Sequence, residues 1–162
     1  MIEGAKIVMA TPAMDTVQSR FYIDAMRLAQ RMTYVAMKGG PGFSVMMTQH
    51  SILSHKRQHL VERALEDGWA THILWIDSDM GFEDQNIALR LLGHDKDIVA
   101  CACPTKTVPN QSTAVMQKSE CEFTPVNPFE HTGLVQVDFV GMGIMLTSID
   151  VFKKIPSPWF ET

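Results

Sequence analysis

Short apolar runs alternate with helix-type segments along most of this chain, and that alternation limits the fold more than any other feature. The apolar runs are too short for buried helices, whereas the segments between them repeat apolar residues at helical spacing. Strands that alternate with helices predict a mainly parallel sheet with right-handed crossovers and helices on both faces. The expected strands are Lys6–Ala10, Phe43–Thr48, Ile73–Ile76 and Asp97–Cys103, and the expected helices are Val17–Met32, Ser51–Asp67 and Asp84–Leu92.

The composition is that of one ordinary globular domain. The chain has 162 residues, of which 46% are hydrophobic and 20% charged, so it can bury a substantial core. Its net charge of −4 and the lack of a basic stripe argue against a nucleic-acid partner. We therefore expect a single α/β domain over residues 1–162.

The sequence carries no sign of a membrane or of secretion. No apolar run approaches the roughly 18 residues of a transmembrane helix, and the N-terminus lacks a basic region followed by a hydrophobic one. The three cysteines cannot all pair within one chain, which favours a reducing compartment. We expect a cytoplasmic protein without a transmembrane segment.

Two acidic residues follow the third apolar run directly. Asp77 and Asp79 are two residues apart, so in an extended segment both side chains can point to one face. Two carboxylates that close repel each other unless a cation or protons relieve the repulsion. A divalent cation with oxygen ligands and open positions would do so and would also bind substrate phosphates. The alternative is that one aspartate caps the next helix and the other lies in solvent.

Polar or turn-forming residues stand at or just after the end of each of the four expected strands. They are Thr11-Pro12, Thr48, Asp77 with Asp79, and Pro104-Thr105-Lys106. In open α/β sheets, ligands bind at the carboxyl ends of the strands. The convergence of these residues on one edge favours a ligand site over simple capping.

The alternation of apolar runs and helix-type segments ends after Lys106. Residues 107–133 are rich in Pro, Asn, Ser and Thr, as in a binding loop or lid, with short strand signals near Thr113–Gln117 and Cys121–Thr124. We expect a strand at Leu134–Val140, interrupted by two glycines before Ile144–Leu146, and a short helix at Val151–Ile155 capped by Ser148 or Asp150. An extended Leu134–Leu146 edge could pair with a second copy of the chain.

These features together resemble nucleotide-sugar-dependent glycosyltransferases of the GT-A fold, close to the family 2-like group of bacteria and phages. The resemblance covers most of the chain. The segments that carry it are Ile7–Pro12, Arg57, Ile73–Met80, Asp97–Val99 with Pro104, Val137–Gly143 and Pro158–Phe160. The aspartate motif gains specificity from its place after the third buried strand.

The resemblance implies a Rossmann-like GT-A three-layer sandwich that binds a nucleoside-diphosphate-sugar donor. Residues 1–106 would form the nucleotide-binding half and residues 107–162 the acceptor-side half. Thr11 and Pro12 would line the nucleotide-base pocket. Arg57 would contact the base or the phosphates, because guanidinium groups suit planar acceptors and phosphate oxygens.

The resemblance also implies a metal site. Asp79 would hold Mn²⁺ or Mg²⁺ against the diphosphate, and Asp77 would bind the metal or face the ribose. Gly141 and Gly143 would let the backbone approach the donor sugar. Relatives of this type continue past the Trp159-Phe160 segment, where they supply a carboxylate base and a further metal ligand. The catalytic base is therefore unassigned, the acceptor-side half is expected to be short, and the acceptor is a glycan, a lipid or a protein.

Two other functions remain open on the same residues. A phosphatase of the haloacid-dehalogenase type would use Asp77 and Asp79 as nucleophile and acid, although two strand-helix units precede them here. A non-catalytic nucleotide-sugar-binding module, or an inactive truncated relative, would need only the donor site.

Other chemistry-bearing residues have simpler interpretations. His55 and His59 have the spacing of a metal pair on a helix but no clear third ligand. Cys101 and Cys103 alternate along a strand and so face opposite ways. Trp159 and Phe160 either close the core or form a platform on which an acceptor sugar stacks.

Overall fold

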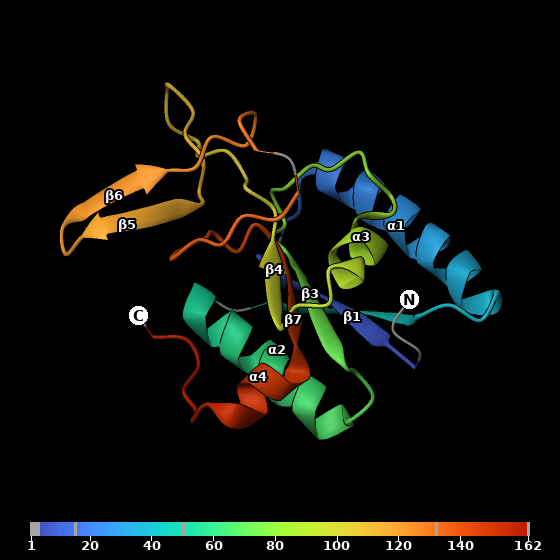
Figure 1. Ribbon diagram of the computed structural model, residues 1–162. Helices are drawn as coiled ribbons and strands as arrows, with labels where there is room; N and C mark the ends of the chain where they lie inside the picture. The colour runs from blue at the N-terminus through green and yellow to red at the C-terminus, as the bar shows by residue number, and fades with distance from the viewer. Residues whose placement is uncertain (1–3, 15, 50, 132, 162) are drawn as a thin grey trace.

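The computed structural model describes residues 4–14, 16–49, 51–131 and 133–161. Within these residues a five-stranded sheet carries helices on both faces, and a two-stranded hairpin projects from it (Figure 1). The sheet consists of β1 (Lys6–Ala13), β2 (Gly42–Gln49), β3 (His72–Ile76), β4 (Ile98–Ala100) and β7 (Ile144–Ser148), and the hairpin of β5 (Val115–Ser119) and β6 (Glu122–Pro125). The helices are α1 (Ser19–Met37), α2 (Leu53–Asp67), α3 (Ile87–Gly93) and α4 (Ile149–Lys154).

The main sheet has the strand order β2-β1-β3-β7-β4. β1 pairs in parallel with both β2 and β3, whereas β7 runs antiparallel between β3 and β4. Four strands therefore share one direction, and the expected mainly parallel α/β sheet is confirmed. The exception is β7, which lies between β3 and β4 in the sheet although β4 follows β3 in the sequence.

The helices cover both faces of the sheet, so the molecule is a three-layer sandwich (Figure 1). Alternate residues of β1 and β3 face opposite layers, as the two-residue period of a strand requires. Ile7, Met9, Leu74 and Ile76 pack with α1 and α3, whereas Val8, Ala10, Ile73 and Trp75 pack with α2 and α4. This double burial explains why the strands read as continuous apolar runs in the sequence.

Local signals set several element boundaries. α2 ends at Gly68, which adopts the left-handed conformation with φ of 61° that glycine tolerates best. α4 begins after Ser148, whose side chain accepts a hydrogen bond from the backbone N–H of Asp150. The expected capping of this helix by Ser148 is thus confirmed, and the short strands expected near Thr113–Gln117 and Cys121–Thr124 lie within a few residues of β5 and β6.

The prediction of a strand at Leu134–Val140 is wrong. Residues 133–140 lack a continuous partner, and only Phe139 forms a bridge, to Val115. The prediction of a free edge over Leu134–Leu146 is also wrong. Ile144–Leu146 belong to β7, which pairs with β3 on one side and β4 on the other.

Candidate functional site

The aspartates lie at the carboxyl end of the central strand β3. The N–H of Asp77 donates to the carbonyl of Gly143 at 3.1 Å, which extends the pairing of β3 with β7 by one residue. The carbonyl of Asp77 accepts from the N–H of Met80 at 3.0 Å and so closes a turn that includes Asp79. The backbone thus fixes both aspartates at the edge where α/β sheets bind ligands.

Asp77 forms an ion pair with Arg57 of α2. The guanidinium Nη2 of Arg57 lies 3.1 Å from Oδ1 and 3.3 Å from Oδ2 of Asp77. Both side chains are largely buried, with exposed fractions of 15% for Arg57 and 28% for Asp77. Burial raises the pKa of Asp77 above its ordinary value, although the charge and hydrogen bond of Arg57 act in the opposite direction. Arg57 therefore orients the carboxylate and offsets part of the cost of burying it.

Asp79 forms an ion pair with Lys106, which lies on the loop after β4. This loop is closed at its base, because the N–H of Thr105 donates to the carbonyl of Gln111 at 2.7 Å. The hydrogen bond and charge of Asp79 raise the pKa of Lys106. The Lys106 side chain is mostly exposed, whereas Asp79 is about one-third exposed. Asp79 is thus the more accessible of the two carboxylates.

The two carboxylates are close enough to affect each other. The charge of Asp79 raises the pKa of Asp77, and the charge of Lys106 lowers it. Two hard carboxylate oxygens suit Mg²⁺ or Mn²⁺ when substrate phosphates and water fill the remaining positions. Within the part of the chain that the structure describes, no group of three His, Cys, Asp or Glu side chains is placed to hold a metal. The residues therefore fit a metal that is shared with a ligand, not one enclosed by protein.

β1 continues through Thr11 and Pro12 to Ala13, so these two residues, which were expected to follow the strand, lie within it, and both are buried. By strand alternation, Thr11 shares a face with Ile7 and Met9, opposite to the face from which Arg57 contacts Asp77. The hydroxyl of Thr11 is buried without a hydrogen-bond partner among the described residues. A ligand that touched both Thr11 and the aspartates would therefore have to reach around the carboxyl end of the sheet. Their assignment to a base pocket stays a prediction.

The glycines allow close contacts within the protein itself. A Cβ on Gly141 would lie 2.9 Å from the Cβ of Thr113, and one on Gly143 would lie 3.3 Å from the Sγ of Cys103 and from the side chain of Met80. The N–H of Gly141 donates to the carbonyl of Thr113 at 3.1 Å. These contacts explain the glycines without a ligand, and their role in donor binding stays a prediction.

Sequence reasoning placed Lys106 at this edge but missed its partner, and it missed two other polar residues nearby. Lys106 binds Asp79 across 27 positions of sequence, so no local pattern could reveal it. Lys56 and Ser54 lie in the first turn of α2, where Lys56 is buried and the Ser54 hydroxyl has no hydrogen-bond partner within the described ranges. For Lys56 and Ser54, the one signal in the sequence was that their helix follows a strand expected to end at the ligand edge.

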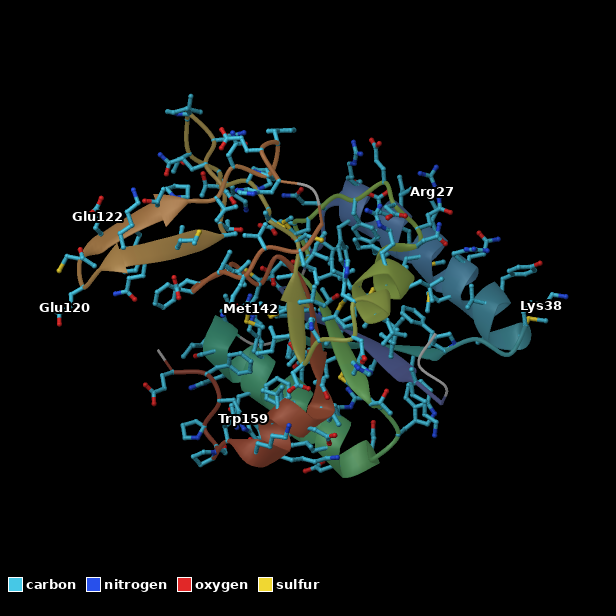
Figure 2. All side chains as sticks on the ribbon, viewed as in Figure 1. Arg27, Lys38, Glu120, Glu122, Met142 and Trp159 are labelled. Carbon is cyan, nitrogen blue, oxygen red and sulfur yellow. The ribbon has the colours of Figure 1, made fainter. Side chains whose placement is uncertain are left out.

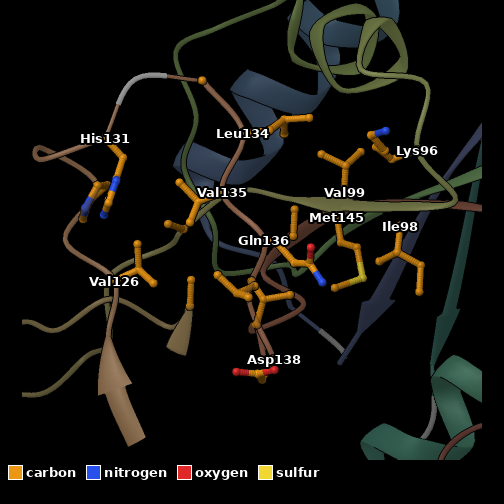
Figure 3. Close-up of a pocket in the computed structure, with 17 residues that line it drawn as sticks. Lys96, Ile98, Val99, Val126, His131, Leu134, Val135, Gln136, Asp138 and Met145 are labelled. Carbon is orange, nitrogen blue, oxygen red and sulfur yellow. The ribbon is translucent and has the colours of Figure 1, made fainter. Parts of the chain in front are cut away.

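A large cavity lies away from the aspartates. It measures about 770 Å³ and separates the edge strand β4 from residues 126–131 and 133–140 (Figure 3). Its walls are mainly aliphatic, with Ile98, Val99 and Met145 on the sheet side. Neither Asp77 nor Asp79 lines it, and a second cavity of about 580 Å³ between β2 and α2 also excludes them. The chemistry of the aspartates, not the size of a cavity, therefore identifies the candidate site.

The remaining candidates have structural roles. Trp159 lies beside α4 (Figure 2) and donates its Nε1–H to the carbonyl of Phe152 at 3.1 Å. Phe160 packs edge-on against Trp75 with ring centroids 5.8 Å apart, so the pair closes the core.

The three cysteines are unpaired, and burial raises the pKa of Cys101 to about 11, so its thiol is neutral at physiological pH. Among the described helices, none has the length and hydropathy to cross a membrane.

Three solved structures resemble this chain at low sequence identity. The A197 protein from STIV matches with a TM-score of 0.59 and 14% identity, over 97% of this chain and 72% of that one. A glycosyltransferase involved in glycosylation of the major capsid of PBCV-1 matches with a TM-score of 0.45 and 12% identity, over 95% and 69%. CMP:2-keto-3-deoxy-manno-octonic acid synthetase, in complex with CTP, matches with a TM-score of 0.49 and 15% identity, over 96% and 80%.

These likenesses concern the fold alone. No protein-family model matches the sequence, and neither does any curated protein sequence. The match to A197 extends over nearly the whole chain but, at 14% identity, concerns the fold alone, and the other two matches have lower TM-scores. The chain therefore has a Rossmann-like α/β fold with a candidate ligand site at the carboxyl end of β3.

Proposed function

We propose that this protein is a glycosyltransferase that uses a nucleoside-diphosphate-sugar donor and a divalent cation. The observation that carries the proposal is the pair Asp77 and Asp79 at the carboxyl end of β3, coupled electrostatically and each matched by a cationic side chain. Such an arrangement suits a ligand that brings both a metal and negative charge. A diphosphate fits that description, and its sugar ester is the donor that the sequence resemblance implies.

Asp79 is the better candidate for the direct metal ligand. It is the more exposed carboxylate, and its partner Lys106 lies on a loop and can move away. Asp77 is oriented by Arg57 and would contact the metal or the donor ribose. Mn²⁺ or Mg²⁺ bound here would neutralise the charge that develops on the leaving diphosphate. Lys106, once released from Asp79, would be free to face the phosphates.

The remaining parts of the proposal follow from the resemblance. Thr11, Pro12, Gly141 and Gly143 are proposed to lie near the donor, and the acceptor is a glycan, a lipid or a protein. The catalytic base is not assigned to any residue. Three unpaired cysteines support a reducing compartment, and we propose the cytoplasm.

Donor consumption tests the proposal against its two rivals. The full chain is incubated with UDP-, GDP- and ADP-sugars and Mn²⁺, and release of the nucleoside diphosphate is followed. We expect release with one class of donor and its loss in Asp79→Asn. Binding without release, with candidate acceptors present, would favour a binding module. Hydrolysis of a generic phosphate ester that Asp77→Asn abolishes would favour the phosphatase.

The structure bears on the phosphatase alternative. A carboxylate nucleophile must present a free oxygen to the phosphorus atom. Both oxygens of Asp77 lie within hydrogen-bond distance of the Arg57 guanidinium. Because this contact occupies both oxygens of Asp77, it favours a role in orienting the ligand over nucleophilic attack on phosphorus.

A further inference from the structure

The two edge strands of the main sheet are built differently. β4 has three residues, and three charged residues, 95–97, precede it directly. Shortness and charge are two of the devices that keep an edge strand from pairing with another chain, and proline and bulges are others. β2 has eight residues, none of them charged or proline, and its eight consecutive partners in β1 leave no bulge. The outer edge of β2 therefore lacks these protections.

This edge carries a regular row of backbone groups. The N–H of Gly42 donates to the carbonyl of Ala5 at 3.0 Å, so the backbone groups of Gly42 point to β1. Those of the next residue point away, and the direction alternates along the strand. The N–H and C=O groups of Phe43, Val45 and Met47 therefore lie on the outer edge, where β2 pairs with no other described strand.

The side chains of the same residues are apolar and only partly covered. The partners of Phe43 and Val45 in β1 are Ile7 and Met9, which pack with α1. Phe43, Val45 and Met47 therefore lie on the α1 face of the sheet. Phe43 packs partly against that core, whereas Val45 is 47% exposed and Met47 41% exposed. α1 thus leaves part of this face of β2 open.

α1 adds apolar surface beside the open strand. One side of the helix, with Asp24 and Arg31, binds the segment that leads into α3. At 3.6 residues per turn, Tyr22 and Met26 lie on the opposite side, which is turned toward β2 because α3 packs on β7 and α1 packs on β2. Tyr22 is 57% exposed and Met26 56% exposed. The edge of β2 and this side of α1 form one uncharged apolar face.

We propose that β2 pairs in antiparallel fashion with β2 of a second copy of the chain, about a two-fold axis at Val45. In this register Val45 lies opposite its own copy, and Phe43 lies opposite Met47 of the other copy. These are the residues whose backbone groups point outward, so they exchange hydrogen bonds across the axis. Each cross-strand pair is apolar and no like charges meet, so the edge is complementary to itself.

The area of this face suits a reversible dimer. At about 3.3 Å per residue the eight residues of β2 run for about 26 Å, and the sheet with its α1 layer is roughly 20 Å deep. Contact over this strip would bury roughly 500 Å² per copy and about 1,000 Å² in total, near the lower limit for a specific interface. Because the paired strands run in opposite directions, each copy keeps its own ligand edge. The inference therefore does not rest on the proposed glycosyltransferase.

Sedimentation velocity of the full chain over a wide range of concentration tests the proposal. We expect a wild-type dimer that dissociates on dilution and no larger assembly. Val45→Lys should be monomeric at every concentration, because two like charges would lie opposite each other at the axis. Met116→Lys replaces a side chain of the same 47% exposure on β5 and should dimerise as the wild type does.

A charge-swap experiment tests both the partner and the register. Val45→Glu alone should also be monomeric, whereas an equal mixture of Val45→Lys and Val45→Glu should form a heterodimer. A mixture that stays monomeric would overturn the proposal, as would dimerisation of Val45→Lys on its own. A wild type that is monomeric at every concentration would also overturn it and leave the edge to a strand of another protein. If Val45→Lys does not fold, Met47→Lys takes its place, and dimerisation of that variant would overturn the proposal.

Discussion

At the scale of single residues, Asp77 and Asp79 carry the same side chain in different surroundings. Asp77 is the more buried and forms an ion pair with Arg57 of α2, which packs against the sheet. Asp79 is the more exposed and pairs with Lys106 on a loop. A fixed carboxylate and an available one, two residues apart, allow one to orient a ligand while the other exchanges a lysine for a metal.

The pKa shift of Asp77 makes stability depend on pH. Because burial raises its pKa in the folded state, the ionised form lowers stability at neutral pH. We expect Asp77→Asn to melt higher than wild type at pH 7.5, and this gap should close as the pH falls through the raised pKa toward the ordinary value of 3.8. Melting curves across this range measure it, with the exposed Glu120→Gln as control. An Asp77→Asn variant that melted lower than wild type at pH 7.5 would mean that pairing with Arg57 outweighs burial.

In the proposed metal site, Lys106 would compete with the metal for Asp79. Removing its charge should make Mn²⁺ binding easier in the absence of donor. We expect Lys106→Met to bind Mn²⁺ about two- to fivefold more tightly than wild type, the range for loss of an exposed ion pair. Paramagnetic resonance of free Mn²⁺ measures the affinity, and Lys118→Met serves as the control. Weaker Mn²⁺ binding in Lys106→Met would instead show that this lysine supports the metal site.

At the scale of elements, the sequence predicted the segments whose signals are local. β1 and β3 are buried on both faces and so read as apolar runs, while Gly68 marks the end of α2. The placement of β7 between β3 and β4 depends on contacts between distant segments, which no local pattern carries. The false strand at Leu134–Val140 has suitable residues but no neighbouring strand to pair with.

The same division applies to the candidate site. Asp77 and Asp79 were predictable because they follow a recognisable strand, and Arg57 because the resemblance includes it. The position of Lys106 at this edge was also predicted, but its ion pair with Asp79 could not be, because it joins two segments that are distant in the sequence. Site residues supplied by tertiary packing leave no signature in one sequence.

Gly141 provides a test at this scale. A Cβ at this position would lie 2.9 Å from the Cβ of Thr113, closer than real Cβ contacts allow. We expect Gly141→Ala to lose about 1–3 kcal/mol of stability by overpacking, as measured by urea denaturation. Gly93→Ala meets no atom within 4 Å and lies at the end of α3, so it should not destabilise. A fully stable Gly141→Ala that loses donor binding would favour approach to a ligand instead.

At the scale of the whole molecule, the sheet separates structural and chemical roles. Its two faces are covered by helices and form the core, while charged groups from α2, from the turn after β3 and from the loop after β4 meet at one end. The large aliphatic cavity lies at the β4 edge, apart from the aspartates. A donor bound to Asp77 and Asp79 would therefore join segments distant in sequence and stabilise the domain as a unit.

The most direct measurement is the melting temperature of wild type and Asp79→Asn with UDP, GDP and ADP, each with and without Mn²⁺. A ligand at about a hundred times its Kd adds about 2.7 kcal/mol of stability, which for a domain of this size is about 5 to 10 °C. We predict such a rise for one diphosphate in wild type, only with Mn²⁺, and its loss in Asp79→Asn. An equal rise in Asp79→Asn, or no rise with any diphosphate and Mn²⁺, would contradict the account.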